Sequence, residues 1–153
     1  HCPIRTDKVP TNYLKKMSNP QMALLLKGID NVHNDQRLRY LNACYYMKKL
    51  KNVNGLRFFY NNISPDDIHL EFPILCNERD KLFEYLLKNN IDSRKFYYRS
   101  LNTLDIYSQF RQKCPNSDLL EGKILLLPCY PRFTRYNQEK IILKIKEFLN
   151  KQT

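Results

Sequence analysis

Basic and aromatic side chains lie together in the six residues from Arg94 to Arg99, which read Arg-Lys-Phe-Tyr-Tyr-Arg. Aromatic rings in such a strand can stack on bases while the neighbouring cations hold phosphates, so the segment is a candidate for binding nucleic acid. The same residues also fit a twisted strand that turns one aromatic face into the core. We favour this second interpretation.

Catalytic signatures are missing from the sequence. The glycines Gly28, Gly55 and Gly122 lie far apart and form no phosphate-binding loop, and neither a His-Glu-x-x-His nor a Gly-x-Ser-x-Gly motif occurs. His33 and His69 fall in different elements, so we expect each to be a surface or packing residue. The sequence therefore predicts no catalytic residue and no metal site.

The cysteines are odd in number, widely spaced and never in a Cys-x-x-Cys pair: Cys2, Cys44, Cys76, Cys114 and Cys129. This spacing argues against a zinc site and against a disulfide scaffold of a secreted protein. We therefore expect reduced thiols and a cytoplasmic location.

Lys and Arg outnumber Asp and Glu by 26 to 15, which gives a formal net charge of +11. A basic chain can bind nucleic acid, a phosphorylated small molecule or an acidic partner, and the charge alone does not choose among them. No apolar run approaches the roughly 20 residues of a membrane-spanning helix, so we expect no membrane association. Because the sequence begins with His1 instead of Met, we expect an excerpt or a processed product.

One long helix is predicted over residues 18–52, after an extended, polar segment at residues 1–17. Ser18 can cap this helix, Pro20 suits its first turn, and Gln21 lies at the capping-box distance from Ser18. Apolar residues recur along it at spacings of three and four. A helix this long must extend past one small core, so we expect it to bind a second domain or subunit.

The remaining segments predict a small sheet backed by helices. Strands are expected at 56–60, 69–75, 91–98 and 123–128, helices at 77–90 and 135–150, a short helix near 105–112, and a loop at 113–123. This order predicts an α+β fold, an α/β sandwich with a long N-terminal helix and a mostly antiparallel sheet.

Taken in order, these segments resemble the C-terminal part of the DegT/StrS-type sugar aminotransferases, which are pyridoxal-phosphate enzymes of the aspartate-aminotransferase fold. The stretch TNYLKKMSNPQMALLLKGID is similar to the phrase that opens a long helix in that family. The stretch FPILCNERDKLFEYLLKNNIDSRKFYY resembles a later phrase of the family, and CPNSDLLEGKILLLPCYPRFTRYNQEKIILKIKEFL resembles its ending. The resemblance implies that residues 18–153 form the small domain and that the large cofactor-binding domain is absent from this sequence.

The resemblance also implies a function for the parent protein. Such an enzyme transfers an amino group to a keto-sugar nucleotide, in amino-sugar or surface-polysaccharide biosynthesis, with pyridoxal phosphate as the electron sink. The Gly-rich phrase around the family's Schiff-base lysine does not occur in these residues, so we expect the chain alone to bind no cofactor and to be inactive. Its expected partners are the N-terminal large domain, the second subunit of a homodimer and a nucleotide-sugar substrate.

Five site residues follow from the resemblance. Asn12 and Lys16 are the candidates for contacting the phosphate of the partner subunit's cofactor. Arg94, Tyr97 and Asn102 are the candidates for lining the substrate site, and Asn102 falls where the family has a histidine. No residue is expected to be catalytic in this chain.

Two other functions stay open at this point. The chain could be a stand-alone basic module that binds nucleic acid through its ends and residues 94–99, although we do not expect nucleic acid as a partner. It could also be a structural dimerisation module whose long helix forms the interface.

Overall fold

The computed structural model describes residues 15–96 and 100–151. The chain divides into two compact units, residues 1–33 and residues 34–153. The first contains α1 (Asn19–Ile29), and the second contains a sheet with its helices.

The predicted long helix is wrong in one respect, because the chain forms two helices. Helix α1 ends at Ile29 and α2 (Val32–Leu50) begins after a turn at Asp30 and Asn31. Gly28, Asp30 and Asn31 are weak helix formers. The side chain of Asn31 donates to the carbonyl of Lys27 at 3.3 Å, so it satisfies a group that the end of α1 leaves open. The start of α1 is as predicted, since the Oε1 of Gln21 accepts from the amide of Ser18 at 3.0 Å.

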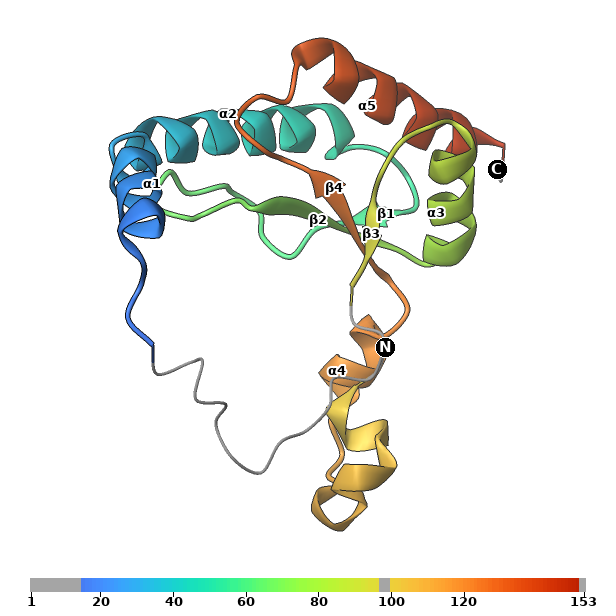
Figure 1. The fold of residues 1–153 in the computed structure, drawn as a ribbon. Helices are drawn as coiled ribbons and strands as arrows, with labels where there is room; N and C mark the ends of the chain where they lie inside the picture. The colour runs from blue at the N-terminus through green and yellow to red at the C-terminus, as the bar shows by residue number, and fades with distance from the viewer. Residues whose placement is uncertain (1–14, 97–99, 152–153) are drawn as a thin grey trace. The chain divides into compact units, whose positions relative to one another are not determined.

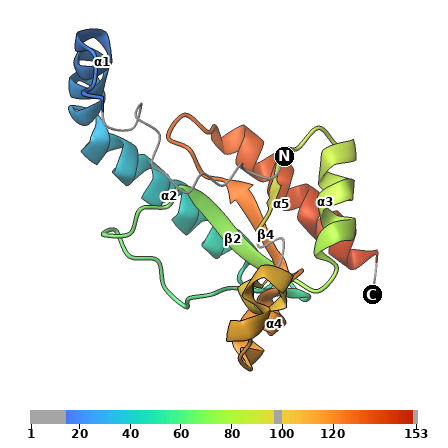
Figure 2. The ribbon, with the colours of Figure 1, turned by 60° about the horizontal axis from the view of Figure 1, so that its bottom comes forward.

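The second unit is built on a four-stranded antiparallel sheet in the order β1-β2-β4-β3. Strands β1 (Leu56–Arg57) and β3 (Arg94–Lys95) are short edges, and β2 (Glu71–Cys76) and β4 (Ile124–Pro128) form the centre. Phe72 lies opposite Leu127 and Ile74 opposite Leu125, so these four side chains share one face. Figure 2 shows β2 and β4 side by side. The fold is therefore the α+β class that the sequence predicts, with an antiparallel sheet.

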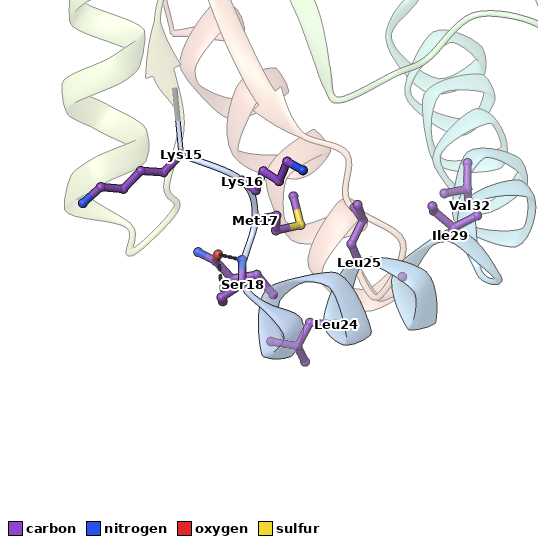
Figure 3. A pocket seen from close by; sticks show the side chains of 10 residues that line it. Lys15, Lys16, Met17, Ser18, Leu24, Leu25, Ile29 and Val32 are labelled. Carbon is purple, nitrogen blue, oxygen red and sulfur yellow. Dashed lines mark hydrogen bonds between the residues drawn. The ribbon is translucent and has the colours of Figure 1, made fainter. Parts of the chain in front are cut away.

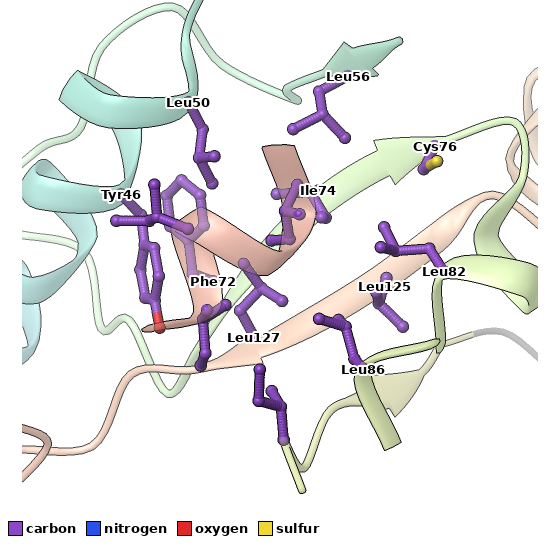
Figure 4. Packing of buried hydrophobic residues seen from close by; sticks show 14 of the residues in the cluster. Tyr46, Leu50, Leu56, Phe72, Ile74, Cys76, Leu82, Leu86, Leu125 and Leu127 are labelled. Carbon is purple, nitrogen blue, oxygen red and sulfur yellow. The ribbon is translucent and has the colours of Figure 1, made fainter. Parts of the chain in front are cut away.

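Helices α2, α3 (Arg79–Lys88) and α5 (Arg135–Asn150) cover one face of this sheet (Figure 1). They supply apolar side chains that are less than a tenth exposed, such as Tyr46 from α2, Leu86 from α3 and Ile145 from α5. Tyr46 stacks on Phe72 with ring centroids 5.2 Å apart. Figure 4 shows how these side chains fill the space between helices and strands. Helices are thus found where they are predicted at 77–90 and 135–150, and each turns an apolar face into this core, although Leu87 of α3 is exposed.

The segment between β3 and β4 differs most from the prediction. The expected loop at 113–123 contains helix α4 (Pro115–Leu120), and the expected short helix consists of two 3₁₀ helices, η2 (Leu101–Thr103) and η3 (Asp105–Phe110). Pro115 in the first turn of α4 is compatible with a helix start. The strands predicted at 56–60 and 91–98 are shorter than expected, and residues 97 and 98 lie outside the described part of the chain.

The segment Pro128–Tyr130, which joins β4 to α5, is held against α2. The side-chain amide of Asn42 donates to the carbonyl of Tyr130 at 3.0 Å, and the hydroxyl of Tyr46 donates to the carbonyl of Pro128 at 3.2 Å. The thiol of Cys129 donates to the carbonyl of Arg39 at 3.3 Å. The two prolines of the sequence Pro-Cys-Tyr-Pro thus belong to a structural junction.

Truncation of the core should cost far more stability than truncation of the surface of the same helix. Ile145 is fully buried, whereas Leu143 on α5 is 55% exposed. We expect Ile145→Ala to lower the free energy of unfolding by about 2–5 kcal/mol, because it removes apolar contact and leaves a cavity. Leu143→Ala should change it by less than about 0.5 kcal/mol. Urea denaturation of both variants measures this, and similar losses would contradict the packing described here.

Cys129 should make the protein less stable at alkaline pH. Burial raises the pKa of its thiol from 9.0 to about 12. The unfolded chain therefore loses this proton first, and the thiol's contribution to stability is present below pH 9.0 and is lost as the pH rises toward about 12.

When the pH rises from about 8 to about 10, the free energy of unfolding should fall in both proteins. We expect the fall to be about 1.4 kcal/mol smaller in Cys129→Ala than in the wild type. Denaturation curves at the two pH values measure this difference. Ile142→Val is the matched core variant, since it perturbs packing and should retain the full alkaline loss. An identical loss in Cys129→Ala and the wild type would show that the thiol is not the group responsible.

Candidate functional site

A groove of about 920 Å³ runs along α1, from the four residues before it to Val32 at the start of α2. Its polar end is formed by Lys15, Lys16 and Ser18, and its apolar side is formed by the stripe Leu25, Ile29 and Val32 (Figure 3). The stripe has the helical spacing that the sequence shows. This groove lies within the first unit of the chain.

The polar end of the groove is suited to an anion. Lys15 and Lys16 are exposed and stand directly before the start of α1, where the helix dipole is positive. Figure 3 shows their side chains extended to opposite sides of the chain. Lys16 is one of the two predicted cofactor residues, and the structure places it on this groove. Asn12, the other, lies outside the described residues. The phosphate contact stays a prediction for both.

The apolar side of α1 is exposed along its whole length. None of the helix residues is buried, and the large apolar side chains are between 46% and 72% exposed: Met22, Leu24, Leu25, Leu26 and Ile29. An isolated helix of 11 residues is only marginally stable in water. Helix α1 therefore presents an apolar surface that we expect another protein surface to bury.

Arg94 is held by a carboxylate on the same sheet. Its guanidinium donates to both carboxylate oxygens of Glu71, with Nε 3.1 Å from Oε1. Glu71 belongs to β2 and Arg94 to β3, and both strands pair with β4, so this ion pair joins the strands on either side of β4. Arg94 thus has a structural contact, and its predicted contact with substrate stays untested.

Lys95 also has an acidic partner. Its ammonium lies 3.0 Å from Oδ1 of Asp80, which also accepts from the Nε of Arg79 at 3.0 Å. The hydrogen bond from Lys95 is the main cause that lowers the pKa of the Asp80 carboxyl, and Arg79 adds to it. Two of the three cations in the candidate nucleic-acid strand are therefore neutralised by carboxylates of the chain.

Asn102 is the centre of a hydrogen-bonded clamp. Its side-chain nitrogen donates to Oδ1 of Asp118 at 3.2 Å and to the carbonyl of Gln112 at 3.3 Å, and its Oδ1 accepts from the hydroxyl of Ser100. The same hydroxyl lies 2.8 Å from that of Ser117. These hydrogen bonds connect η2 to α4 within residues 100–118.

Asn102 also lines a cavity of about 270 Å³ on this segment. Two of its apolar lining side chains, Leu101 and Phe110, are exposed. Tyr97, the third predicted substrate residue, lies outside the described part of the chain. The structure therefore describes three of the five predicted site residues and places them on separate elements.

The partners of these residues were missed by the sequence analysis. Nothing in the spacing of Glu71, Asp80 or Asp118 indicates which cation or amide each will meet, because all three contacts join separate elements of the chain. Lys15 was missed as well, although it stands directly beside Lys16. His69, which was predicted to be a surface or packing residue, is buried, with its Nε2 3.2 Å from the carbonyl of Ser64.

Within the described residues, no group of three or more His, Cys, Asp or Glu side chains could hold a metal ion. Among the helices of the same ranges, none combines the length and hydropathy that crossing a membrane requires.

Comparison with known proteins adds a family and a fold. The model of the DegT/DnrJ/EryC1/StrS aminotransferase family matches residues 5–146. A search of curated proteins found no match.

Similar solved structures include three bacterial proteins. An aminotransferase of the DegT/DnrJ/EryC1/StrS type from Brucella abortus is 26% identical, with a TM-score of 0.74, over 87% of this chain and 36% of that one. DesV from S. venezuelae, in complex with a ketimine intermediate, is 20% identical with a TM-score of 0.77, over 84% and 36%. NtdA from Bacillus subtilis, with the bound cofactor PMP, is 19% identical with a TM-score of 0.77, over 88% and 33%. The chain thus spans about a third of the length of these structures.

Loss of the amide of Asn102 should open the segment between η2 and α4. We expect Asn102→Ala to cost about 1.5 kcal/mol of local stability, because it removes hydrogen bonds to the exposed residues Gln112 and Asp118 and to the buried Ser100. The amides of Thr103 and Tyr107, which bond to the carbonyls of Ser100 and Leu104, should then exchange with solvent at least about tenfold faster.

Hydrogen exchange followed by mass spectrometry measures this change. Asn62→Ala is the matched control, because Asn62 is an exposed asparagine in a distant loop. Unchanged exchange in Asn102→Ala would mean that the clamp contributes nothing and that the amide is available for another role.

Proposed function

The chain belongs to the DegT/DnrJ/EryC1/StrS aminotransferase family, and we propose that it acts as the C-terminal small domain of an aminotransferase that uses pyridoxal phosphate and a keto-sugar nucleotide. The observation that carries this proposal is the match of the family model to nearly the whole chain. The fold supports it, because the chain resembles about a third of each of several aminotransferase structures. NtdA holds the cofactor PMP. Two further similar structures are CalS13, a sugar aminotransferase, and Spr1654, a putative sugar aminotransferase in its PMP form.

The residues at the start of α1 fit a phosphate group. Two lysines and the positive end of a helix are the features that proteins commonly use to bind phosphate. Lys16, with Lys15 beside it, would hold the phosphate of the cofactor, and Asn12 would assist. Bound pyridoxal phosphate supplies an electron sink for amino transfer. The chain's own contribution is to bind and orient this phosphate, and the Schiff-base lysine would come from the large domain.

The exposed apolar face of α1 supports the proposal that the chain binds other parts of such an aminotransferase. We assign it to the large domain and the second subunit of a cytoplasmic homodimer, which would bury the stripe Leu25, Ile29 and Val32. These side chains are about half exposed, so burying what remains of each is favourable by roughly 1 kcal/mol. In the described part of this unit, Lys15, Lys16 and Lys27 favour an acidic covering surface.

The second candidate function, nucleic-acid binding through residues 94–99, has weaker support. Arg94 and Lys95 are already paired with Glu71 and Asp80, so their charges are largely compensated within the chain. Binding driven by phosphate contacts would show as an affinity that falls steeply with salt concentration. A gel-shift titration therefore separates the two functions.

The cofactor test compares the 153-residue chain with the longer polypeptide encoded when the coding sequence upstream of His1 is included. After incubation with pyridoxal phosphate and reduction with borohydride, peptide mapping should find one modified lysine in the longer protein, upstream of His1. The 153-residue chain should carry no specific modification. A stoichiometric label on one lysine of this chain would overturn the proposal, as would an upstream sequence without a Gly-rich segment that contains a lysine.

A matched pair of variants tests the phosphate contact in the longer protein. Lys16→Gln should weaken the affinity for pyridoxal phosphate about tenfold, because a hydrogen bond to a charged group is lost. Lys48→Gln removes an exposed lysine from α2 and should leave the affinity unchanged. Equal affinities in the two variants would remove Lys16 from the site.

A further inference from the structure

A second cavity, of about 280 Å³, lies in the sheet unit where three segments meet. These are the turn after α3, the connection from β4 to α5, and the first turns of α5. The volume lies just below the roughly 300–1,000 Å³ of sites for drug-sized molecules, so it suits a small metabolite.

The floor of this cavity is apolar and rigidly packed. Ile91 is 5% exposed and Ile141 is 3% exposed, and both belong to the core cluster. The ring of Phe133 forms one side, held by an edge-to-face contact with Tyr130 whose centroids are 4.9 Å apart. A hydrocarbon or aromatic side chain of a ligand would find an apolar surface here.

The rim carries four polar side chains of three kinds. Asp92 supplies a carboxylate, Lys140 an ammonium, and Asn90 and Asn137 two carboxamides. Within the described part of the chain, none of these side chains makes a hydrogen bond or an ion pair, although many other charged groups do. All four of these side chains are exposed at the rim, so the charged groups of Asp92 and Lys140 are accessible to a ligand in the cavity.

One of the carboxamides belongs to a residue with an unusual backbone conformation. Asn90 has a φ of 57°, in the left-handed region, directly after α3. Its amide donates to the carbonyl of Leu87 at 3.0 Å and the amide of Ile91 donates to that of Leu86 at 3.0 Å, which is the pattern of a Schellman motif. Glycine is the usual residue at this position, and asparagine is the common substitute. Here asparagine adds a donor and an acceptor to the rim.

We propose that this cavity binds a free α-amino acid with an apolar side chain. Lys140 receives the carboxylate, Asp92 receives the ammonium, and the side chain lies on Ile91 and Ile141. The two carboxamides supply further hydrogen bonds to the charged groups of the ligand. A phosphate ligand fits less well, because the single ammonium of the rim stands with a carboxylate that repels a dianion.

The charge pattern is tested with L-leucine and two analogues that each lack one charge. Isopentylamine lacks the carboxylate and 4-methylpentanoate lacks the ammonium. In a protein-observed NMR titration, L-leucine should shift the amides of Ile91, Asn137 and Lys140 saturably. Each analogue should bind about tenfold more weakly, because one charge-assisted hydrogen-bonded contact is lost.

Variants of the rim test the same contacts from the side of the protein. Lys140→Gln and Asp92→Asn should each weaken L-leucine binding about tenfold. Asn90→Gly, which suits the left-handed backbone, should weaken it severalfold while the protein stays folded. Lys48→Gln and Asp66→Asn change exposed charges elsewhere and should leave binding unchanged.

Three results would overturn the proposal. The first is the absence of saturable shifts with L-leucine up to about 10 mM, a concentration at which even weak specific binding is visible. The second is equal binding of L-leucine and both analogues, which would identify a nonspecific apolar hollow. The third is unchanged binding in both Lys140→Gln and Asp92→Asn. Because the probe and variants do not involve α1 or pyridoxal phosphate, this outcome is independent of the proposed function.

Discussion

The sheet unit depends on the junction between α2 and the end of β4. Backbone carbonyls that are shielded from water need donors, and the prolines at 128 and 131 have no backbone N–H with which to provide them. Side chains of α2 supply them, since Asn42 and Tyr46 donate to the segment across more than eighty residues of sequence. The connection is reciprocal, because the fully buried Gln138 of α5 donates to the backbone carbonyl of Asn42 at 3.1 Å. Buried polar groups of this kind cost more when broken than they contribute when made, so they specify one register of helix against sheet.

The periodic elements of this unit could be predicted from the sequence, and the contacts between elements could not. Helix α5 is found at Arg135–Asn150 where its apolar period predicts it, and the run Ile-Leu-Leu-Leu-Pro forms β4. These signals are local, and they are strong because a buried helix face and a central strand both require continuous apolar positions. The break at Asp30 and Asn31 was missed because the apolar stripe continues through it. Helix α4 was missed because six residues are too few to show a period.

In the candidate sites, too, the sequence indicates the type of each residue but not the contacts that the residue makes. The sequence indicates a basic strand at 94–99, and a reading of charge alone suggests a nucleic-acid surface. Glu71 and Asp80 change that picture, because each brings a carboxylate from another element to a cation of the strand. Asn102 is a related case, since its amide is already hydrogen-bonded to three groups of its own segment. A residue's chemistry can be read from its type, but its availability depends on partners that only the folded chain brings together.

The two units of the chain differ in how their apolar surface is used, and this difference bears on function. From Asn42 to Leu50, α2 buries its inner face against the sheet, whereas α1 buries no residue although it is richer in leucine. A sequence retains exposed leucines at helical spacing when another surface covers them, because exposed apolar stripes favour aggregation. The lysines before α1 stand at one end of that stripe, next to a helix start that attracts anions. The proposed anion site and the proposed docking face share one groove, so a partner that covers α1 would also enclose an anion held by the lysines. This arrangement is what a domain needs if it completes a phosphate site at an interface and leaves the bond-making groups to its neighbour.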